Sequence, residues 1–275
     1  MQRALNIEAC KVNEHCVGLR WEVSDADYLA RIISVIAMGQ AVHAAQIIAD
    51  LSPAAPAIND EALREYAKLR LSIKGDTKNA QKASRWHRDG LIFEAISWVA
   101  ARQLADGEVL LKDPHISATT QGLDGFMIEL DEKGTTITRA TIFEDKCSED
   151  PRRMFRDEIL PAFAVYHRNK RASELVAAAA TLISTKLTGT AATQAAARVL
   201  DLQFRAYRAG LAIEACSDSE NGRAALFKGY EKLDKITDKQ RIGATFVTTA
   251  ELRDWFDEMA ELAIAYIDGL AKDGA

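Results

Sequence analysis

The stretch Thr-Arg-Ala-Thr-Ile-Phe-Glu-Asp-Lys at 138–146 decides the fold of this chain. Threonine, isoleucine and phenylalanine favour β-strands, so the stretch is predicted to be extended. Side chains two residues apart on a strand share one face, which places Glu144 and Lys146 together. The preceding Asp-Glu-Lys-Gly at 131–134 is typical of a turn that joins this strand to an earlier one at about 122–130. The two strands are expected to form a hairpin.

The earlier strand begins with Gly-Leu-Asp-Gly at 122–125, which supplies a second carboxylate. In an antiparallel hairpin Asp124 can lie beside Glu144, but the register that decides this is open at the level of sequence. If they converge, both offer the hard oxygen ligands that Mg²⁺ prefers, and Mn²⁺ could substitute for it. Lys146 would then orient the attacking water or help to deprotonate it, since a bound metal lowers the pKa of that water. The pattern predicts hydrolysis of a phosphodiester by in-line attack on phosphorus.

Two plainer interpretations of the same residues stay open. On an ordinary exposed strand, Glu144 and Lys146 would form only a same-face ion pair, and short motifs of this kind often occur by chance. The chain could also be an unrelated helical protein, in which case 122–146 would not be a hairpin. Convergence of Asp124 with Glu144 and Lys146 distinguishes these interpretations.

A further carboxylate stands on an expected helix. Between 92 and 100 an apolar residue recurs every three or four positions, which is helical spacing. Glu94 therefore either projects from this helix into the metal site or is a solvated helix glutamate. Its neighbours Phe93 and Ala95 are apolar, and an unpaired charge among apolar residues is costly. Both interpretations of Glu94 are kept.

The order of these elements resembles the PD-(D/E)XK, or restriction-endonuclease-like, nuclease superfamily over about 85–170. The resemblance implies an α/β fold in which a mixed central sheet with flanking helices forms an αβββαβ core. It also implies Mg²⁺-dependent cleavage of nucleic acid, with DNA expected before RNA. The elements that carry the resemblance are a helix with Glu94, a strand at about 108–113, a strand with Asp124, a strand ending in Glu144-x-Lys146, and a helix at about 151–169.

Residue by residue, the resemblance assigns Asp124 and Glu144 to the metal and Lys146 to catalysis. Leu123 stands where the superfamily has a proline before the aspartate, at a position that varies. The Gly-Leu-Asp-Gly and Glu-x-Lys spacing is also similar to that of nuclease subunits of bacterial antiphage systems such as Hachiman. That similarity implies a role in antiviral defence beside a protein partner such as a helicase.

The remaining segments predict an N-terminal accessory region, 1–84, followed by a nuclease domain, 85–275. A strand at 242–247 is expected to be the last core strand, separated from the others by a helical insertion at about 172–238. Pro161 is expected to kink the helix that contains it. The other expected elements are a small hairpin within 1–23 and helices at 26–50, 59–73, 173–186 and 190–215. A last helix is expected to follow a cap at Thr248 or Thr249 and to run to about 271.

The formal net charge of −5 is unusual for an autonomous nucleic-acid binder, because phosphate contacts supply most nonspecific affinity. Basic residues nevertheless gather at 64–88 and again at 152–171, where they either line a phosphate track or form solvated helix faces. An acidic chain with local basic segments predicts that a partner helps to deliver substrate. The alternative function is a catalytically silent nuclease-fold module that binds nucleic acid or a partner protein.

Composition places the chain among ordinary globular proteins, with 48% hydrophobic and 27% charged residues. The first ten residues lack a basic start followed by an apolar core, and the best apolar run, 175–183, is too short for a bilayer. The four cysteines include no Cys-x-x-Cys pair. A cytoplasmic enzyme without membrane contact is the expectation.

Overall fold

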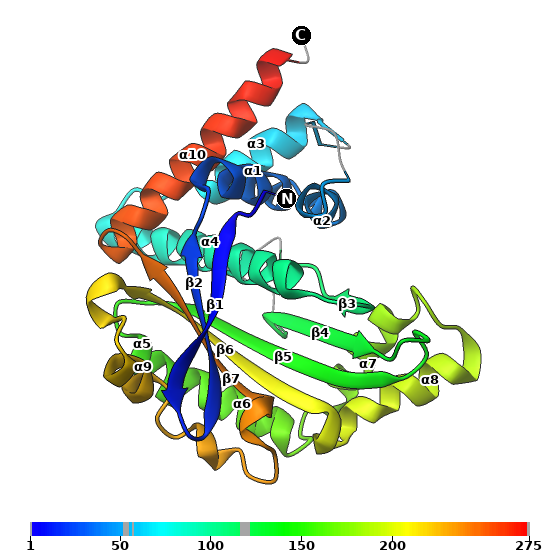
Figure 1. Cartoon of the computed structure of the whole chain (residues 1–275). Helices are drawn as coiled ribbons and strands as arrows, with labels where there is room; N and C mark the ends of the chain where they lie inside the picture. Colours follow the sequence, from blue (N-terminus) through cyan, green and yellow to red (C-terminus); the bar gives the residue numbers. More distant parts are fainter. Residues whose placement is uncertain (1, 52–54, 57, 116–121, 274–275) are drawn as a thin grey trace.

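The computed structural model describes residues 2–51, 55–56, 58–115 and 122–273, and a mixed β-sheet forms its centre (Figure 1). Seven strands lie in the order β1-β2-β7-β6-β5-β4-β3. The inner strands β2, β7, β6 and β5 are parallel neighbours, and antiparallel pairs complete both edges. The strands are β1 (Leu5–Asn13), β2 (Cys16–Val23), β3 (Val109–Leu111), β4 (Gly125–Leu130), β5 (Ile137–Cys147), β6 (Arg205–Glu214) and β7 (Arg241–Thr248).

Helices cover both faces of the sheet and enclose two hydrophobic cores. Residues of α1, α2, α3, α4 and α10 form the first core, and residues of α6, α7, α8 and α9 form the second. Strand β5 contributes to both, with Phe143 in the first core and Ile142 in the second. The helices are α1 (Ala26–Ala37), α2 (Ala41–Ile48), α3 (Glu61–Leu71), α4 (Lys78–Leu104), α5 (Pro151–Met154), α6 (Leu160–His167), α7 (Ala172–Ile183), α8 (Gly189–Ala197), α9 (Glu220–Leu226) and α10 (Leu252–Asp273).

Helix α4 carries Glu94, as predicted, and is the longest element described, with 27 residues. The side chain of Thr77 caps its first turn by accepting a hydrogen bond from the backbone N–H of Ala80. Ile92 and Ile96 are fully buried against the sheet, so the apolar spacing of this segment reflects its inner face. Burial of this face fixes the helix across the strands.

The N-terminal region shares the sheet with the rest of the chain. β1 and β2 confirm the expected hairpin, and β2 pairs in parallel with β7, which sets Trp21 opposite Phe246. The expected helix at 26–50 is divided into α1 and α2 at Gly39, whose φ of 78° ends the first helix. The boundary expected at residue 84 falls inside α4.

The expected helix at 190–215 is wrong beyond Ala197, because Arg205–Glu214 forms the strand β6. This strand lies between β5 and β7, at the centre of the sheet, so the segment 172–238 is not an all-helical insertion. Its residues are buried on both faces apart from the last one. A strand of this kind shows no alternation of polar and apolar residues. The helix was expected because Tyr207 and Leu211 of this strand continue the helical spacing of Leu200 and Phe204.

The other expected strands are confirmed as β3, β4, β5 and β7, and the final helix as α10. The helix expected at 151–169 continues past Pro161 without a break. A π-helical turn over Phe155–Ile159 precedes the proline and joins α5 to α6. A wider turn relieves the clash that a proline ring causes with the preceding turn of an α-helix.

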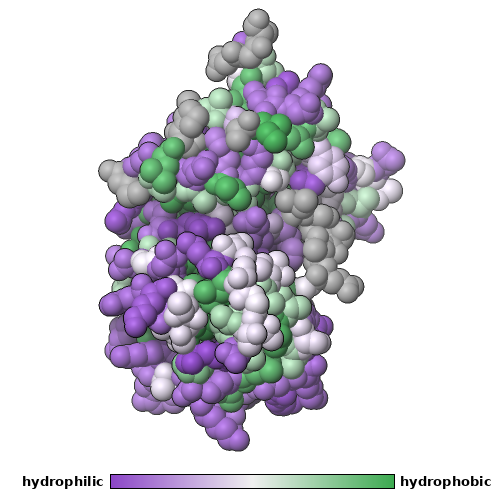
Figure 2. All heavy atoms as spheres, turned by 90° about the vertical axis from the view of Figure 1, so that its right-hand side faces the viewer, coloured by the Kyte–Doolittle hydropathy of each residue, from purple (hydrophilic) through white to green (hydrophobic). Residues whose placement is uncertain are grey.

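On the face of the molecule seen in Figure 2, hydrophilic and hydrophobic side chains are interspersed. Within the described ranges, every helix is either too short or too polar to cross a lipid bilayer.

Candidate active site

The candidate site forms where β4 begins and β5 ends. The two strands are antiparallel with Gly125 opposite Phe143, so the next pair in the same register is Asp124 with Glu144. Oδ2 of Asp124 accepts a hydrogen bond from the backbone N–H of Asp145 at 3.1 Å. The register left open by the sequence therefore brings the two predicted carboxylates together.

Gly125 is required for this close approach. A Cβ atom at this position would lie 2.4 Å from Cδ2 of Phe143, whose ring covers the glycine from the neighbouring strand. Any larger residue would push β4 away from β5, and Asp124 would move with it. The second glycine of Gly-Leu-Asp-Gly is thus explained by packing against Phe143.

Lys146 lies between the two carboxylates. Its Nζ is 3.1 Å from Oδ2 of Asp124 and 3.5 Å from Oε2 of Glu144. Glu144 is buried, whereas the side chains of Asp124 and Lys146 are 23% and 27% exposed. The three residues named from the sequence therefore converge, and two of them are reached by solvent.

The protonation states follow from burial and from the proximity of like charges. Burial and the nearby charge of Asp124 raise the pKa of Glu144 to about 8, against the opposing effect of Lys146. Burial disfavours the charged form of Lys146, but Asp124 and Glu144 outweigh it and raise the pKa of the ammonium group. Lys146 is therefore a cation and a hydrogen-bond donor at neutral pH, not a base.

The two carboxylates fit a hard divalent cation. Asp124 and Glu144 repel each other when both are ionised, and a cation bound between them would remove that repulsion. Mg²⁺ is commonly held by one or two carboxylates together with water and substrate phosphate. Among the described residues, no group of three or more His, Cys, Asp or Glu side chains is arranged to hold a metal ion. Asp124 and Glu144 would therefore be a two-carboxylate site.

Glu94 contacts His115. Its Oε1 accepts the backbone N–H of His115 at 2.7 Å and lies 3.1 Å from Nδ1 of the same residue. Nε2 of His115 is in turn 2.9 Å from Nζ of Lys112. The structure thus connects Glu94 to the chain that follows β3, and its direct contacts are with the histidine.

Lys112 was not identified from the sequence. Its Nζ donates to the carbonyl oxygen of Leu123 at 2.9 Å, next to Asp124. Burial lowers the pKa of Lys112, and the negative charges of Glu94 and Asp124 partly offset this effect. Both carboxylates therefore act on one lysine. A single lysine just after a short apolar strand carries no motif that would have revealed this role.

Asp145 anchors the end of β5 from the other face of the sheet. Its Oδ2 accepts the hydroxyl of Ser97 on α4 at 2.5 Å and lies 3.8 Å from the guanidinium of Arg208 on β6. Burial raises the pKa of Asp145 to about 6, although Arg208 favours the charged form. Gly210 leaves space for this carboxylate, since a Cβ there would lie 2.1 Å from its Oδ1. Glu144 and Lys146 are therefore held by a buried contact on the residue between them.

Comparison of the chain with protein-family models, with curated proteins and with solved structures gives no match in any of the three. The site therefore has to be interpreted from its own geometry.

Proposed function

We propose that this protein is a Mg²⁺-dependent nuclease that hydrolyses phosphodiester bonds, with DNA as the first substrate to test and RNA as the second. The observation that carries the proposal is the position of Lys146 between Asp124 and Glu144, at the carboxyl end of β5. Two carboxylates and a lysine meet at the end of a strand, where solvent reaches two of the three side chains.

The order of elements supports the same proposal. From α4 onwards the chain runs α4-β3-β4-β5, then the helices α5, α6, α7 and α8, then β6. This fits the αβββαβ order expected of the PD-(D/E)XK superfamily, with β6 rather than the expected strand at 242–247 as the last strand. In this order Glu144 and Lys146 lie on the strand next to β6, and Asp124 lies at the start of β4.

In the proposed reaction Asp124 and Glu144 would hold the metal through carboxylate oxygens. A bound divalent cation supplies electrophilic assistance to the phosphoryl oxygens and lowers the pKa of its water. Lys146 remains protonated, orients the attacking water and offsets negative charge at the phosphate. Asp145, held by Ser97, keeps the end of β5 in place. Lys112 fixes the backbone before Asp124.

One observation favours the alternative, a nuclease-fold module that binds nucleic acid or a partner protein without catalysis. Glu94 is bound to His115, and the described residues present two rather than three carboxylates at the site. A helicase partner and a role in antiviral defence stay expectations that rest on the resemblance alone.

Cleavage of labelled DNA and RNA, single-stranded and duplex, with Mg²⁺ or Mn²⁺ tests the proposal. Glu144→Gln and Lys146→Met should each lower the rate by at least about 100-fold, as for loss of a group that stabilises charge in the transition state. Glu132→Gln and Lys133→Met are the matched controls, because both residues are exposed in the β4–β5 turn. Wild-type rates in Glu144→Gln or Lys146→Met would overturn the proposal. A wild-type protein that binds nucleic acid but never cleaves it would support the module without catalysis.

A further inference from the structure

A stripe of exposed side chains follows the first turns of α4. Lys78, Lys82 and Trp86 are spaced four residues apart, so they lie on one side of the helix, and all three are exposed. Trp86 is 46% exposed, and Nζ of Lys82 lies 5.0 Å from the centre of its ring. These three residues are called the α4 stripe below. An exposed tryptophan among lysines is a surface for stacking and for charge.

Two hollows open beside α4, on different sides of the helix. The first, of about 420 Å³, lies between α3 and α4 and is lined by Tyr66, Arg70 and Lys74, among others. The second, also of about 420 Å³, is lined by the stripe itself together with Glu149 and Arg253. Tyr66 is 54% exposed, with the guanidinium of Arg70 4.0 Å from the centre of its ring. Each hollow thus combines cations with an exposed aromatic ring.

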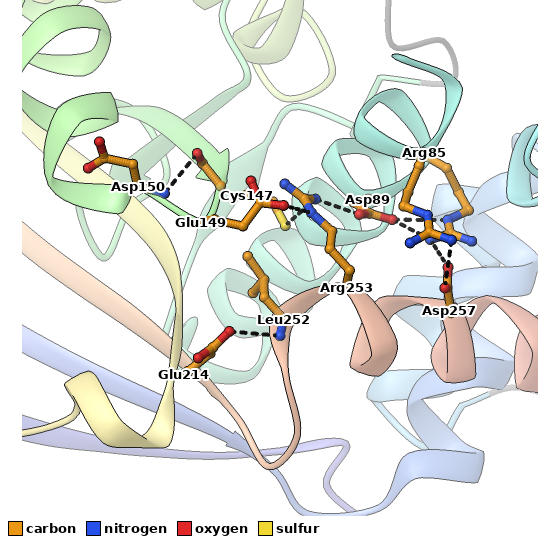
Figure 3. A network of polar contacts seen from close by, with 11 residues as sticks. Arg85, Asp89, Cys147, Glu149, Asp150, Glu214, Leu252, Arg253 and Asp257 are labelled. Atoms are coloured by element: carbon orange, nitrogen blue, oxygen red, sulfur yellow. Dashed lines mark hydrogen bonds and ion pairs between the residues drawn. The ribbon is translucent and has the colours of Figure 1, made fainter. Parts of the chain in front are cut away.

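The arginines of this region are largely held by carboxylates. Figure 3 shows Arg85 directed toward Asp257, and Arg253 extended between Glu149 and Asp89. The charges of Arg85 and Arg253 are therefore largely neutralised by these carboxylates. The exposed lysines Lys74, Lys78 and Lys82 carry positive charge outward, in a chain whose formal net charge is −5.

The second hollow adjoins the end of β5. Nε of Arg253 lies 2.6 Å from Oε1 of Glu149, and its NH1 nitrogen lies 3.8 Å from Sγ of Cys147 (Figure 3). Cys147 directly follows Lys146 of the candidate active site. The basic surface on α4 and the carboxyl end of β5 are therefore joined through a single arginine.

We propose that the α4 stripe and the hollow that it lines bind single-stranded nucleic acid. Lys78 and Lys82 contact phosphates, and Trp86 stacks on an unpaired base. Stacking on an exposed ring favours a single strand, because the bases of a duplex are already stacked on one another. The inference rests on the proposed nuclease function only for the role of the bound strand as substrate. Binding itself does not require catalysis.

Fluorescence anisotropy with a labelled oligothymidylate of about 20 nucleotides, in EDTA and with the full-length protein, tests this inference. The wild type should bind the single strand more tightly than a duplex of the same length. Trp86→Ala should weaken binding by about tenfold, and Trp86→Phe should restore most of it, because stacking needs only an aromatic face. Circular dichroism should show the same helix content for each variant.

The lysines are tested through salt dependence. In a Lys78→Gln, Lys82→Gln double variant, the slope of log K against log[salt] should be shallower by about 1.4, since each phosphate contact to a single strand contributes about 0.7. Lys228→Gln with Lys232→Gln is the matched control, because both lysines are exposed after α9. That control should keep the wild-type slope.

Equal affinity of the wild type and Trp86→Ala would overturn the inference, and so would tighter binding of the duplex. The two proposals fail separately. One outcome is that the wild type and Glu144→Gln bind the single strand equally well while the wild type cleaves no nucleic acid with any metal tested. In that case the binding surface is supported and the nuclease proposal is wrong. If the protein cleaves DNA while the Trp86 and lysine variants bind normally, the nuclease stands and substrate enters elsewhere.

Discussion

Lys146 and Asp124 are joined by a 3.1 Å contact between Nζ and Oδ2, and the same oxygen accepts the backbone N–H of Asp145. One carboxylate oxygen thus ties the start of β4 to two consecutive residues of β5. Because Glu144 precedes these two residues, any shift of Asp124 changes both the charge around Lys146 and the position of Glu144. Ionisation and packing at this site are therefore coupled, and the affinity for the proposed metal would depend on both.

The free energy of unfolding should depend on pH because the pKa of the buried Glu144 carboxyl is raised. Its pKa is about 8 in the folded protein, against an ordinary value of 4.5. A carboxyl group with a raised folded pKa contributes stability that is present below its unfolded pKa and is lost as the pH rises through the folded value. Between about pH 5 and pH 8.5, wild type should therefore lose about 1–4 kcal/mol of unfolding free energy relative to Glu144→Gln, which cannot ionise.

Urea denaturation in EDTA across this pH range measures the difference, and the neutral substitution Asp124→Asn serves as a second comparison. Removing the charge of Asp124 should lower the pKa of Glu144 and reduce the loss of stability at high pH. If the wild-type and Glu144→Gln curves run parallel from acid to alkaline pH, Glu144 titrates normally and the coupling is absent.

Divalent cations should stabilise the protein through the same two carboxylates. Binding to the folded state alone adds about 2.7 kcal/mol when the free ion is at 100 times its Kd, so saturating Mg²⁺ should raise Tm by several degrees. The increase should be larger at about pH 8.5 than at about pH 6.5, because protons compete for Glu144. Differential scanning fluorimetry provides the measurement. If Mg²⁺ raised the Tm of Asp124→Asn as much as that of the wild type, the ion would bind elsewhere.

The hairpin that carries the site was predictable from two local features, the strand propensity of its residues and the glycine in its turn. Threonine, isoleucine and phenylalanine mark β5, and a turn with Gly134 in the left-handed region, φ 68°, connects it to β4. The convergence of Asp124 and Glu144 was not predictable, because it depends on a register that packing of Gly125 against Phe143 supports. Local patterns identify strands, whereas contacts between strands decide the site.

The parts of the site missed by the sequence lie on elements without a distinctive pattern. Arg208 belongs to β6, which is buried on both faces and was mistaken for a helix. Ser97, which it contacts, is more than a hundred positions away, and Asp145 is about sixty positions away. No local sequence pattern reveals contacts over such separations. Lys112 was missed for a different reason: its partners His115 and Leu123 are only three and eleven positions away, but no motif marks a single lysine after a short strand.

The role of Glu94 can be separated from that of the two converging carboxylates. Glu94→Gln keeps an oxygen that accepts the His115 N–H, so the contact with the chain after β3 should persist. We expect Mg²⁺ affinity within about twofold of wild type in this variant, and a loss of at least about tenfold in Asp124→Asn, since ligand charge largely sets the affinity. Isothermal titration calorimetry measures both. A comparable loss in both variants would mean that Glu94 leaves His115 to become a ligand.

Gly125→Ala tests whether packing between β4 and β5 places the site. The new Cβ would meet Cδ2 of Phe143 at 2.4 Å, so the strands must separate, at a cost of about 1–3 kcal/mol in unfolding free energy. Asp124 should shift with β4, and Mg²⁺ affinity should fall together with stability.

Gly90→Ala is the matched control: its Cβ would meet nothing within 4 Å on α4, and alanine there should stabilise by up to about 1 kcal/mol. Urea denaturation and Mg²⁺ titration of both variants measure the two effects. A Gly125→Ala protein as stable as Gly90→Ala, with wild-type Mg²⁺ affinity, would show that the close approach of Phe143 does not control the position of Asp124.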